Sequence, residues 1–352
     1  MTTTGQRSGL RVTVLGAGII GLACADELRR RGHRVRVLDP APCSGATHAA
    51  AGMLAPDAEV WHGEPDLHAH GRASARLWHT WAERLGLTLH TRGTLLVGHD
   101  AADLQEVTRQ ADLLAGLGSA PRALDRRSVG ELEPGLARVA GGHLLRDDLA
   151  VDPREAVDAL RGRLSDAIEP TPGDLTPRTT RGADAVVVAT GARLPAPFTH
   201  LVRRVRGEVV RVRSDDPPTH VVRAVVRGHS VYLVPRADGQ VVVGATSEEH
   251  DAPAQVTAGG VLRLLHAARQ LWPALDRATF VEALARDRPG TPDNRPLVGP
   301  THLPGVVLAA GHHRHGVLLA PLTAHLVADH LAGGDLIDAW HPQRFTTGRT
   351  PC

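Results

Sequence analysis

The sequence predicts an α/β chain, α+β overall, in which a doubly wound domain is interleaved with a domain built on an antiparallel sheet. Three observations predict this class. A β-branched strand at 11–15 leads through a glycine turn into a helix at 22–31. From Val202 the apolar residues alternate with period two, at hairpin spacing. After residue 257, segments whose apolar residues have helical spacing alternate again with strand-like segments.

The elements of the first part follow from local patterns. Gly32 closes the first helix, residues 34–38 alternate as a second strand, and apolar residues recur at helical spacing over 66–85. The further elements expected before residue 200 are strands at 88–97, 143–145 and 185–189 and helices at 101–117 and 153–164.

The later part contains the antiparallel block. Its expected strands lie at 202–212, 221–226, 230–234 and 240–245. They are followed by a helix at 257–271, strands at 279–285 and 306–309 on either side of a Pro/Gly-rich loop, and a helix from about Val317 to Leu331.

Because the antiparallel block lies between β-α segments, discontinuous domains are expected. The first, cofactor-binding domain would consist of 10–60, 140–200 and 284–345. The second, substrate-binding domain would consist of 61–139 and 201–283. Flexible tails are expected at 1–9 and 346–352.

Composition excludes several functions. The chain has 352 residues, 42% of them hydrophobic and 22% charged, as is usual for a soluble globular protein. It contains no lysine, which excludes a Walker A phosphate loop, a pyridoxal Schiff base and a Tyr-x-x-x-Lys dyad. A net charge of +2 with scattered arginines indicates no nucleic-acid partner.

Cysteines, histidines and apolar runs exclude further classes. Cys24, Cys43 and Cys352 have no C-x-x-C spacing, which suits a reducing compartment, and the 21 histidines form no recognisable ligand set, so no metal is expected. No apolar run reaches the roughly 18 residues of a membrane span. The expected location is the cytoplasm, without membrane contact.

A glycine motif carries the first functional prediction. The residues Gly16, Ala17, Gly18, Ile19, Ile20 and Gly21 follow a strand and open a helix, and Asp39 ends the next strand 18 residues after Gly21. This is the dinucleotide fingerprint of a Rossmann-like domain, with the pyrophosphate at the helix N-terminus and the acid at the ribose. The alternative is a tight glycine turn with Asp39 as a loop cap. The motif occurs once, so one dinucleotide is expected.

From Leu10 to Phe345 the chain resembles the D-amino-acid oxidase superfamily of FAD enzymes, and within it the glycine oxidases of thiamine thiazole synthesis. The resemblance rests on VTVLGAGIIGLACADELRRRGHRVRVLD, GATHAAAGMLAP, VVVATGA, VRGEVVRVR, YLVPRADGQVVVGAT, RPGTPDNRPLVG and GHHRHGVLLAP, in that order. It implies noncovalent FAD in the Rossmann-like domain, with the flavin ring facing an antiparallel substrate domain.

The resemblance also assigns cofactor-binding residues. Small residues suit a segment that passes beside a planar ring, and the C-terminal glycine loop would lie against that ring. In this loop His313 stands where an aromatic residue is common and His315 where Asn is common. Besides the fingerprint and Asp39, the assigned residues are Ser44, Thr47, Ala50, Ala51, Gly52, Met53, Thr190, Gly191, Gly311, His313, Arg314, His315, Gly316 and Val317.

The substrate residues are likewise assigned by resemblance. Arg288 matches the arginine that binds the substrate carboxylate, and Tyr232 matches the tyrosine that adds a third hydrogen bond. Met53 and Arg314 complete the catalytic set. Arg286, two residues before Arg288, is a second candidate and is expected on the face of the segment opposite to Arg288.

The implied reaction is oxidative deamination of glycine or a similar small amine, giving glyoxylate, ammonia and hydrogen peroxide. Hydride would pass to flavin N5 and O2 would reoxidise the flavin; no general base is required if the amine is unprotonated. Thiazole synthase is an expected partner for the imine, and a homo-oligomer is expected.

Two alternatives stay open. One is a D-amino-acid or sarcosine-type oxidase or dehydrogenase on the same fold, and the other is a flavin-binding protein without turnover. The absence of lysine and of a cysteine between Cys43 and Cys352 favours the glycine oxidases over sarcosine oxidases. The short, Pro-rich stretch at 165–184 predicts a thinner adenine-binding side of the cofactor site and weaker binding of FAD.

Overall fold

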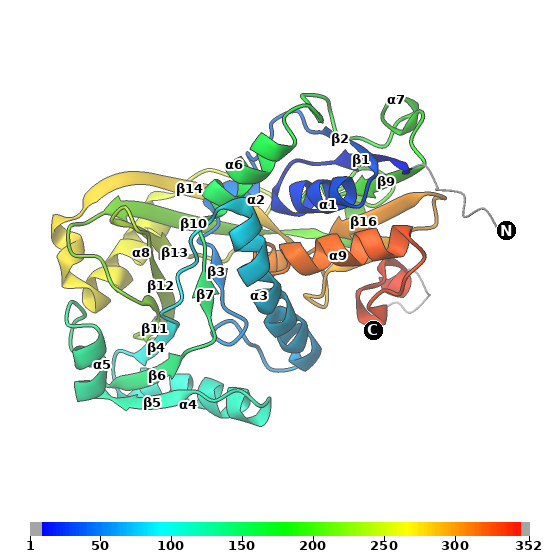
Figure 1. Cartoon of the computed structure of the whole chain (residues 1–352). Helices are drawn as coiled ribbons and strands as arrows, with labels where there is room; N and C mark the ends of the chain where they lie inside the picture. Colours follow the sequence, from blue (N-terminus) through cyan, green and yellow to red (C-terminus); the bar gives the residue numbers. More distant parts are fainter. Residues whose placement is uncertain (1–8, 346–352) are drawn as a thin grey trace. The chain divides into compact units, whose positions relative to one another are not determined.

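The computed structural model describes residues 9–345 and confirms a mixed α/β chain (Figure 1). The described chain divides into two compact units. The first unit contains residues 9–48, 154–204 and 288–345, and the second contains 49–153 and 205–287. The expected tails, apart from Gly9, lie outside the described residues.

The first unit is built on a six-stranded sheet in the order β15-β16-β9-β1-β2-β8, parallel except for the β15–β16 pair. Because β2 and β9 pair with opposite edges of β1, the strand order changes direction beside β1, which is where open α/β sheets bind ligands. The strands are β1 (Arg11–Leu15), β2 (Arg34–Leu38), β8 (Ile168–Glu169), β9 (Ala185–Val188), β15 (Leu297–Pro300) and β16 (Val306–Ala310).

Helices cover this sheet. Helix α1 (Ile19–Arg30) is buried from Ile19 to Leu28 because it packs against both the sheet and α9 (Ala320–Leu331) (Figure 1). Helix α6 (Pro153–Arg163) begins at the boundary of the unit, and α2 (Ala46–Ala49) and α7 (Pro177–Thr180) are single turns. The burial of β1 and β9 on both faces explains their continuous Val-rich runs.

The second unit is built on an eight-stranded sheet in the order β14-β10-β13-β12-β11-β4-β6-β5, in which β4 and β11 are parallel. One face packs against α8 (Ala258–Leu271), and the other against α4 (Ala101–Gly116) and the segment 49–60. The strands are β4 (Thr94–Gly98), β5 (Arg122–Asp125), β6 (Gly141–Leu145), β10 (Arg203–Arg213), β11 (Val221–Val226), β12 (His229–Pro235), β13 (Gln240–Gly244) and β14 (Thr279–Gly290).

A short two-stranded sheet and two helices also belong to this unit. Strand β3 (Met53–Leu54) pairs antiparallel with β7 (Leu149–Ala150). Helix α3 (Pro65–Leu85) follows β3, and α5 (Arg126–Leu132) follows β5. Trp78 and Trp81 of α3 are buried with their ring planes nearly perpendicular. The apolar face expected over 66–85 is therefore part of the hydrophobic core.

The structure corrects several expected boundaries. Helix α1 begins at Ile19, three residues early, because helical geometry starts inside the glycine turn, and α9 begins at Ala320, after a 3-10 turn at His313–His315. Strand β4 begins at Thr94 rather than at residue 88. Strand β14 runs to Gly290, so it includes Arg288.

The two units differ from the expected domain division chiefly at two places. Residues 49–60 and 140–153 belong to the second unit rather than the first. The physical reason is strand pairing: β3 pairs with β7, and β6 lies between β4 and β5 in the second sheet. The segment expected beside the flavin is therefore anchored in the second unit.

Candidate active site

The glycine turn between β1 and α1 is closely packed at its two ends and open in its centre. Gly16 has a φ of +103°, and a Cβ there would lie 2.4 Å from the Ala189 carbonyl oxygen. A Cβ on Gly21 would lie 2.0 Å from the Gly16 oxygen, whereas a Cβ on Gly18 would meet only Thr47 Oγ1, at 3.5 Å. Packing therefore requires Gly16 and Gly21, and the space at Gly18 can receive a ligand at the helix N-terminus.

Side chains of the first unit hold this turn. Asp39 Oδ2 accepts the Ala17 N–H at 2.7 Å, and Thr47 Oγ1 accepts the Ile19 N–H at 3.2 Å. The Cys43 thiol donates to the Ala17 carbonyl at 3.1 Å. The second Asp39 oxygen accepts the Ala41 N–H, so any ribose contact by Asp39 must use its remaining lone pairs.

The end of β9 offers one further group for a ligand. Thr190 Oγ1 is buried without a hydrogen-bond partner among residues 9–345. The next residue, Gly191, has a φ of 66°, and nothing lies within 4 Å of the position that a Cβ would take there. A buried hydroxyl of this kind normally has a partner, and a bound nucleotide would supply one.

The C-terminal glycine loop is rigidly held. Gly311 has a φ of 73°, and a Cβ there would lie 2.5 Å from the Thr291 methyl. His312 is buried and bonds to Thr323 Oγ1 at 2.9 Å, and the His315 N–H donates to the His312 carbonyl at 2.9 Å. Gly316 and Val317 lie in the turn before α9. The helix therefore begins at Ala320, three residues after the predicted start at Val317.

Three arginines of this unit act electrostatically on His313. Burial, followed by the positive charges of Arg314, Arg288 and Arg203, lowers the pKa of His313 to about 3. His313 is therefore neutral at pH 7. Arg314 Nη1 lies 3.4 Å from His313 Nδ1, and an acceptor role for Nδ1 would leave the ring proton on Nε2.

Residues outside the predicted set fix the loop that follows Arg288. Arg344 binds both oxygens of Asp293, at 2.9 and 3.0 Å, and also the Pro296 and Arg295 carbonyls. Burial acts to raise the pKa of Asp293, but Arg344 outweighs it, so that the pKa is lowered and Asp293 stays ionised. Arg203 donates to the Thr291 carbonyl.

The expected position of Arg286 was wrong. Arg286 and Arg288 both lie in β14, and residues two apart in a strand project from the same face. Both side chains are half-buried. Arg286 thus becomes a direct competitor for the role assigned to Arg288.

In the second unit, polar side chains hold the segment that contains Met53. Arg211 donates to the Ala50 carbonyl at 3.4 Å, and Arg236 donates to the Ala51 carbonyl. The Gly52 carbonyl accepts the Val151 N–H at 2.9 Å. Gly52 has a φ of 78°, and a Cβ there would lie 2.0 Å from the Val151 oxygen, so only glycine fits.

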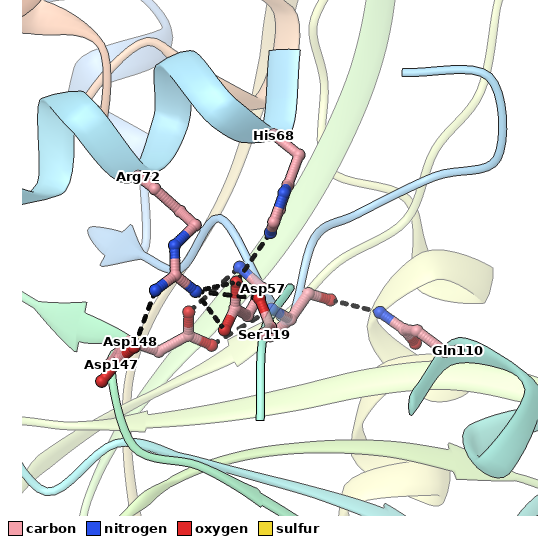
Figure 2. Close-up of polar contacts among 8 residues, drawn as sticks. Asp57, His68, Arg72, Gln110, Ser119, Asp147 and Asp148 are labelled. Atoms are coloured by element: carbon pink, nitrogen blue, oxygen red, sulfur yellow. Dashed lines mark hydrogen bonds and ion pairs between the residues drawn. The ribbon is translucent and has the colours of Figure 1, made fainter. Parts of the chain in front are cut away.

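Figure 2 shows a buried network at the far end of this segment, with Asp57 at its centre. Asp57 Oδ1 lies 2.7 Å from His68 Nε2 and accepts from Ser119 Oγ at 3.0 Å. Arg72 also donates to Asp57, at 3.2 Å, and to Asp147 at 2.9 Å. Asp148 accepts the N–H groups of Asp57 and Ala58, both at 3.1 Å.

The pKa values of Asp57 and Asp148, two of the three aspartates in this network, are shifted in opposite directions. Burial, followed by the charge of Asp57, raises the pKa of Asp148 well above its usual range. Burial also opposes ionisation of Asp57, but His68, Arg72 and Ser119 lower its pKa. Asp148 therefore favours folding most when it is protonated, and its contribution to stability declines as the pH rises above about 4.

Tyr232 lies on the face of the second sheet that packs against the same segment. Its side chain is half-buried and packs against the cluster that includes Met53. Its neighbours in register are Arg223 on β11 and Gly244 on β13. A Cβ on Gly244 would lie 2.3 Å from Tyr232 Oη, so the absence of a side chain at residue 244 allows the phenol to lie across β13.

Comparison with known proteins identifies the family. Residues 11–330 match the family described as FAD dependent oxidoreductase. The chain belongs to the FAD dependent oxidoreductase family. Its cofactor is therefore FAD, and the open position at Gly18 and the buried Thr190 hydroxyl fit a bound dinucleotide.

Relatives within the family are similar over most of this chain. It is 36% identical to the bifunctional protein ThiO/ThiG of Synechocystis over 97% of its length, but spans only 55% of that relative. It is 35% identical to the putative thiamine biosynthesis oxidoreductase ThiO of Rhizobium etli, covering 95% of this chain and 99% of the relative. The structure of glycine oxidase from Geobacillus kaustophilus matches with a TM-score of 0.85 and 29% identity, covering 95% and 99% of the two chains.

No helix within residues 9–345 of this FAD dependent oxidoreductase is both long and apolar enough to span a bilayer.

For this family member we expect Gly244→Ala to displace the Tyr232 phenol, because the two groups would need the same space. If Tyr232 binds the substrate carboxylate, as the sequence predicts, the KM for a small amino acid should rise about tenfold, the cost of one lost hydrogen bond to a charged group, with a smaller change in kcat. In a Tyr232→Ala background the second substitution should have no further effect. Steady-state kinetics of the four proteins measure this coupling, and additive effects would show that Gly244 does not act through Tyr232.

We also expect His312 to limit stability in acid. Burial lowers its pKa to about 3, so between pH 6.5 and 3 the unfolded chain binds a proton that the folded chain does not. Stability therefore falls as the pH falls through this window, by on the order of 5 kcal/mol from this group. His312→Gln, which can still bond Thr323, should flatten this acid branch in urea unfolding at several pH values. A parallel pH profile in the variant would contradict the assignment.

Proposed function

We propose that this chain catalyses the FAD-dependent oxidative deamination of glycine or a similar small amine, with O2 as electron acceptor. The main support is similarity over nearly the whole chain to a ThiO and to a glycine oxidase structure. The positive charges of Arg314, Arg288 and Arg203, which lower the pKa of His313, are of the sign that an amino-acid carboxylate needs.

The mechanism uses the residues of this chain to bind and orient the substrate. When bound, FAD would supply the hydride acceptor and the means of reducing O2 to hydrogen peroxide. Arg288 binds the carboxylate through its two parallel N–H donors, and the Tyr232 hydroxyl adds a third hydrogen bond. Because His313 is neutral, the arginines and not this histidine supply the positive charge for the carboxylate. An amine that binds unprotonated needs no general base.

Met53, Arg314 and the glycine-loop residues keep their proposed places beside the flavin. Their support is the burial of Met53 and, in the glycine loop, of Gly311, His312, His315 and Val317. Asp39, Thr190 and Gly191 are proposed to contact the adenosine and pyrophosphate side of FAD, and Ser44 and Thr47 are proposed to belong to the segment that passes beside the flavin.

Anaerobic mixing tests this function. Glycine should bleach the yellow band of the bound flavin, and admission of oxygen should restore it with one hydrogen peroxide formed per glycine consumed. No bleaching by glycine, sarcosine or D-alanine would contradict an amine-oxidising enzyme and favour a flavin-binding protein without turnover. Bleaching that only a dye reverses would indicate a dehydrogenase.

Rates on the same three substrates separate a glycine oxidase from a sarcosine or D-amino-acid oxidase. A thiazole synthase partner is proposed because the ThiO/ThiG relatives carry both names in one chain. Co-sedimentation of the two purified proteins tests it. The homo-oligomer and the cytoplasmic location stay predictions.

A further inference from the structure

Two buried arginines of the second unit require an explanation. Arg211 in β10 is 1% exposed, and the side chain of Arg236, just after β12, is 8% exposed. Each lies beside one carboxylate: Arg211 Nε is 3.4 Å from Glu282 Oε1, and Arg236 Nε is 3.2 Å from Asp152 Oδ2. Burying a guanidinium is costly even when it is paired, so hydrophobic side chains would suit a purely structural role better.

Both guanidiniums act on the same short backbone segment. They donate to the carbonyls of Ala50 and Ala51, and the next carbonyl, of Gly52, is fixed by the Val151 N–H. Three consecutive carbonyl groups are thus held by the second unit. The segment is short of polar side chains, so its backbone amides are its main polar groups.

Peptide geometry sets the direction of the amide hydrogens. In a trans peptide the C=O and N–H bonds point in opposite directions. The N–H of Ala51 therefore points away from Arg211, and the N–H of Gly52 points away from Arg236. A cation bound to a carbonyl polarises the whole amide and makes its N–H a stronger donor.

We propose that Arg211 and Arg236 are positioning residues for FAD. They fix the Ala50–Met53 segment and polarise its N–H groups toward acceptor atoms of the flavin ring, which favours the negatively charged, reduced ring. This inference rests on the proposed function, because it uses the assignment of this segment to the flavin. In a chain without lysine, arginine is the only side chain that carries a permanent positive charge.

Sulfite provides a test without turnover, because it adds to oxidised flavin and leaves the ring negatively charged. Arg236→Met should raise the Kd for sulfite about tenfold and lower the reduction potential of the bound flavin. Arg236→Lys should recover part of the loss. Asp152→Asn, which keeps the arginine but removes its counter-charge, should change both quantities in the opposite direction.

Arg213→Met is the matched control. Arg213 lies two residues from Arg211 in the same strand, but it is exposed and paired with Asp238. Its substitution should leave sulfite binding and the potential unchanged. If Arg236→Met and Asp152→Asn shift the sulfite Kd in the same direction, or if Arg236→Met resembles the control, the inference is wrong.

The proposed function is tested separately, by the reaction of the wild-type flavin with glycine. If Arg236→Met and Asp152→Asn shift the sulfite Kd in opposite directions but glycine does not bleach the wild-type flavin, the proposed substrate is contradicted and the positioning role is supported. If Arg236→Met does not fold, Asp152→Asn decides the matter, because only an electrostatic role predicts a lower sulfite Kd.

Discussion

Gly21→Ala is expected to yield little folded protein, whereas Gly18→Ala should fold but lose FAD. At Gly21 a Cβ would lie 2.0 Å from the Gly16 carbonyl oxygen, and neither backbone can move without separating α1 from β1. Overpacking of this kind costs about 3 kcal/mol or more where the neighbour is backbone. At Gly18 a Cβ meets only Thr47 at ordinary contact distance, so the fold tolerates it.

The loss at Gly18 would come from the ligand. A methyl group at the helix N-terminus would occupy the space of the pyrophosphate, and we expect the Kd for FAD to rise about 100-fold. Thermal unfolding and flavin content after gel filtration measure the two effects. Gly162→Ala in α6 is the control, since nothing lies within 4 Å of its Cβ. Full flavin content in Gly18→Ala would place the dinucleotide elsewhere.

This contrast indicates what the sequence could and could not predict. The strand, glycine turn, helix and acid in register predicted the first unit because each is a local pattern. The alternative of Asp39 as a loop cap anticipated bonds to backbone N–H groups, but the sequence did not identify Ala17 as a partner. It also did not reveal that Thr47, 28 residues from Ile19, bonds the first N–H of α1. Those contacts depend on the path of the chain through space.

Buried arginines were missed for a related reason. In VRGEVVRVR the alternation suggests outward arginines, but both faces of the second sheet are covered, so Arg211 is buried beside Glu282. Arg344 and Arg203 were missed because each acts on the loop at 291–296 from a distant part of the chain. Gly244 offered a signal, an isolated glycine at the end of a strand, whose meaning required the position of Tyr232.

Arg288→Met should cost substrate binding about 2 to 5 kcal/mol, a rise in KM of roughly 30-fold to several thousand-fold. Methionine keeps much of the side-chain volume but removes the two parallel donors that a carboxylate requires. Arg288→Lys should recover only part of the loss, because an ammonium cannot bind both oxygens in the same way. The Kd of a carboxylate inhibitor, read from the flavin spectrum, measures binding without turnover.

Arg286→Met is the decisive control, because Arg286 projects from the same face of β14. If Arg288 binds the carboxylate, Arg286→Met should leave the inhibitor Kd nearly unchanged. The reverse result would transfer the role to Arg286. Arg288 has the stronger claim because its charge is among those that lower the pKa of His313 in the C-terminal glycine loop. Equal, small effects of both variants would show that the carboxylate is bound by another cation, and the neighbouring Arg314 would be the first to test.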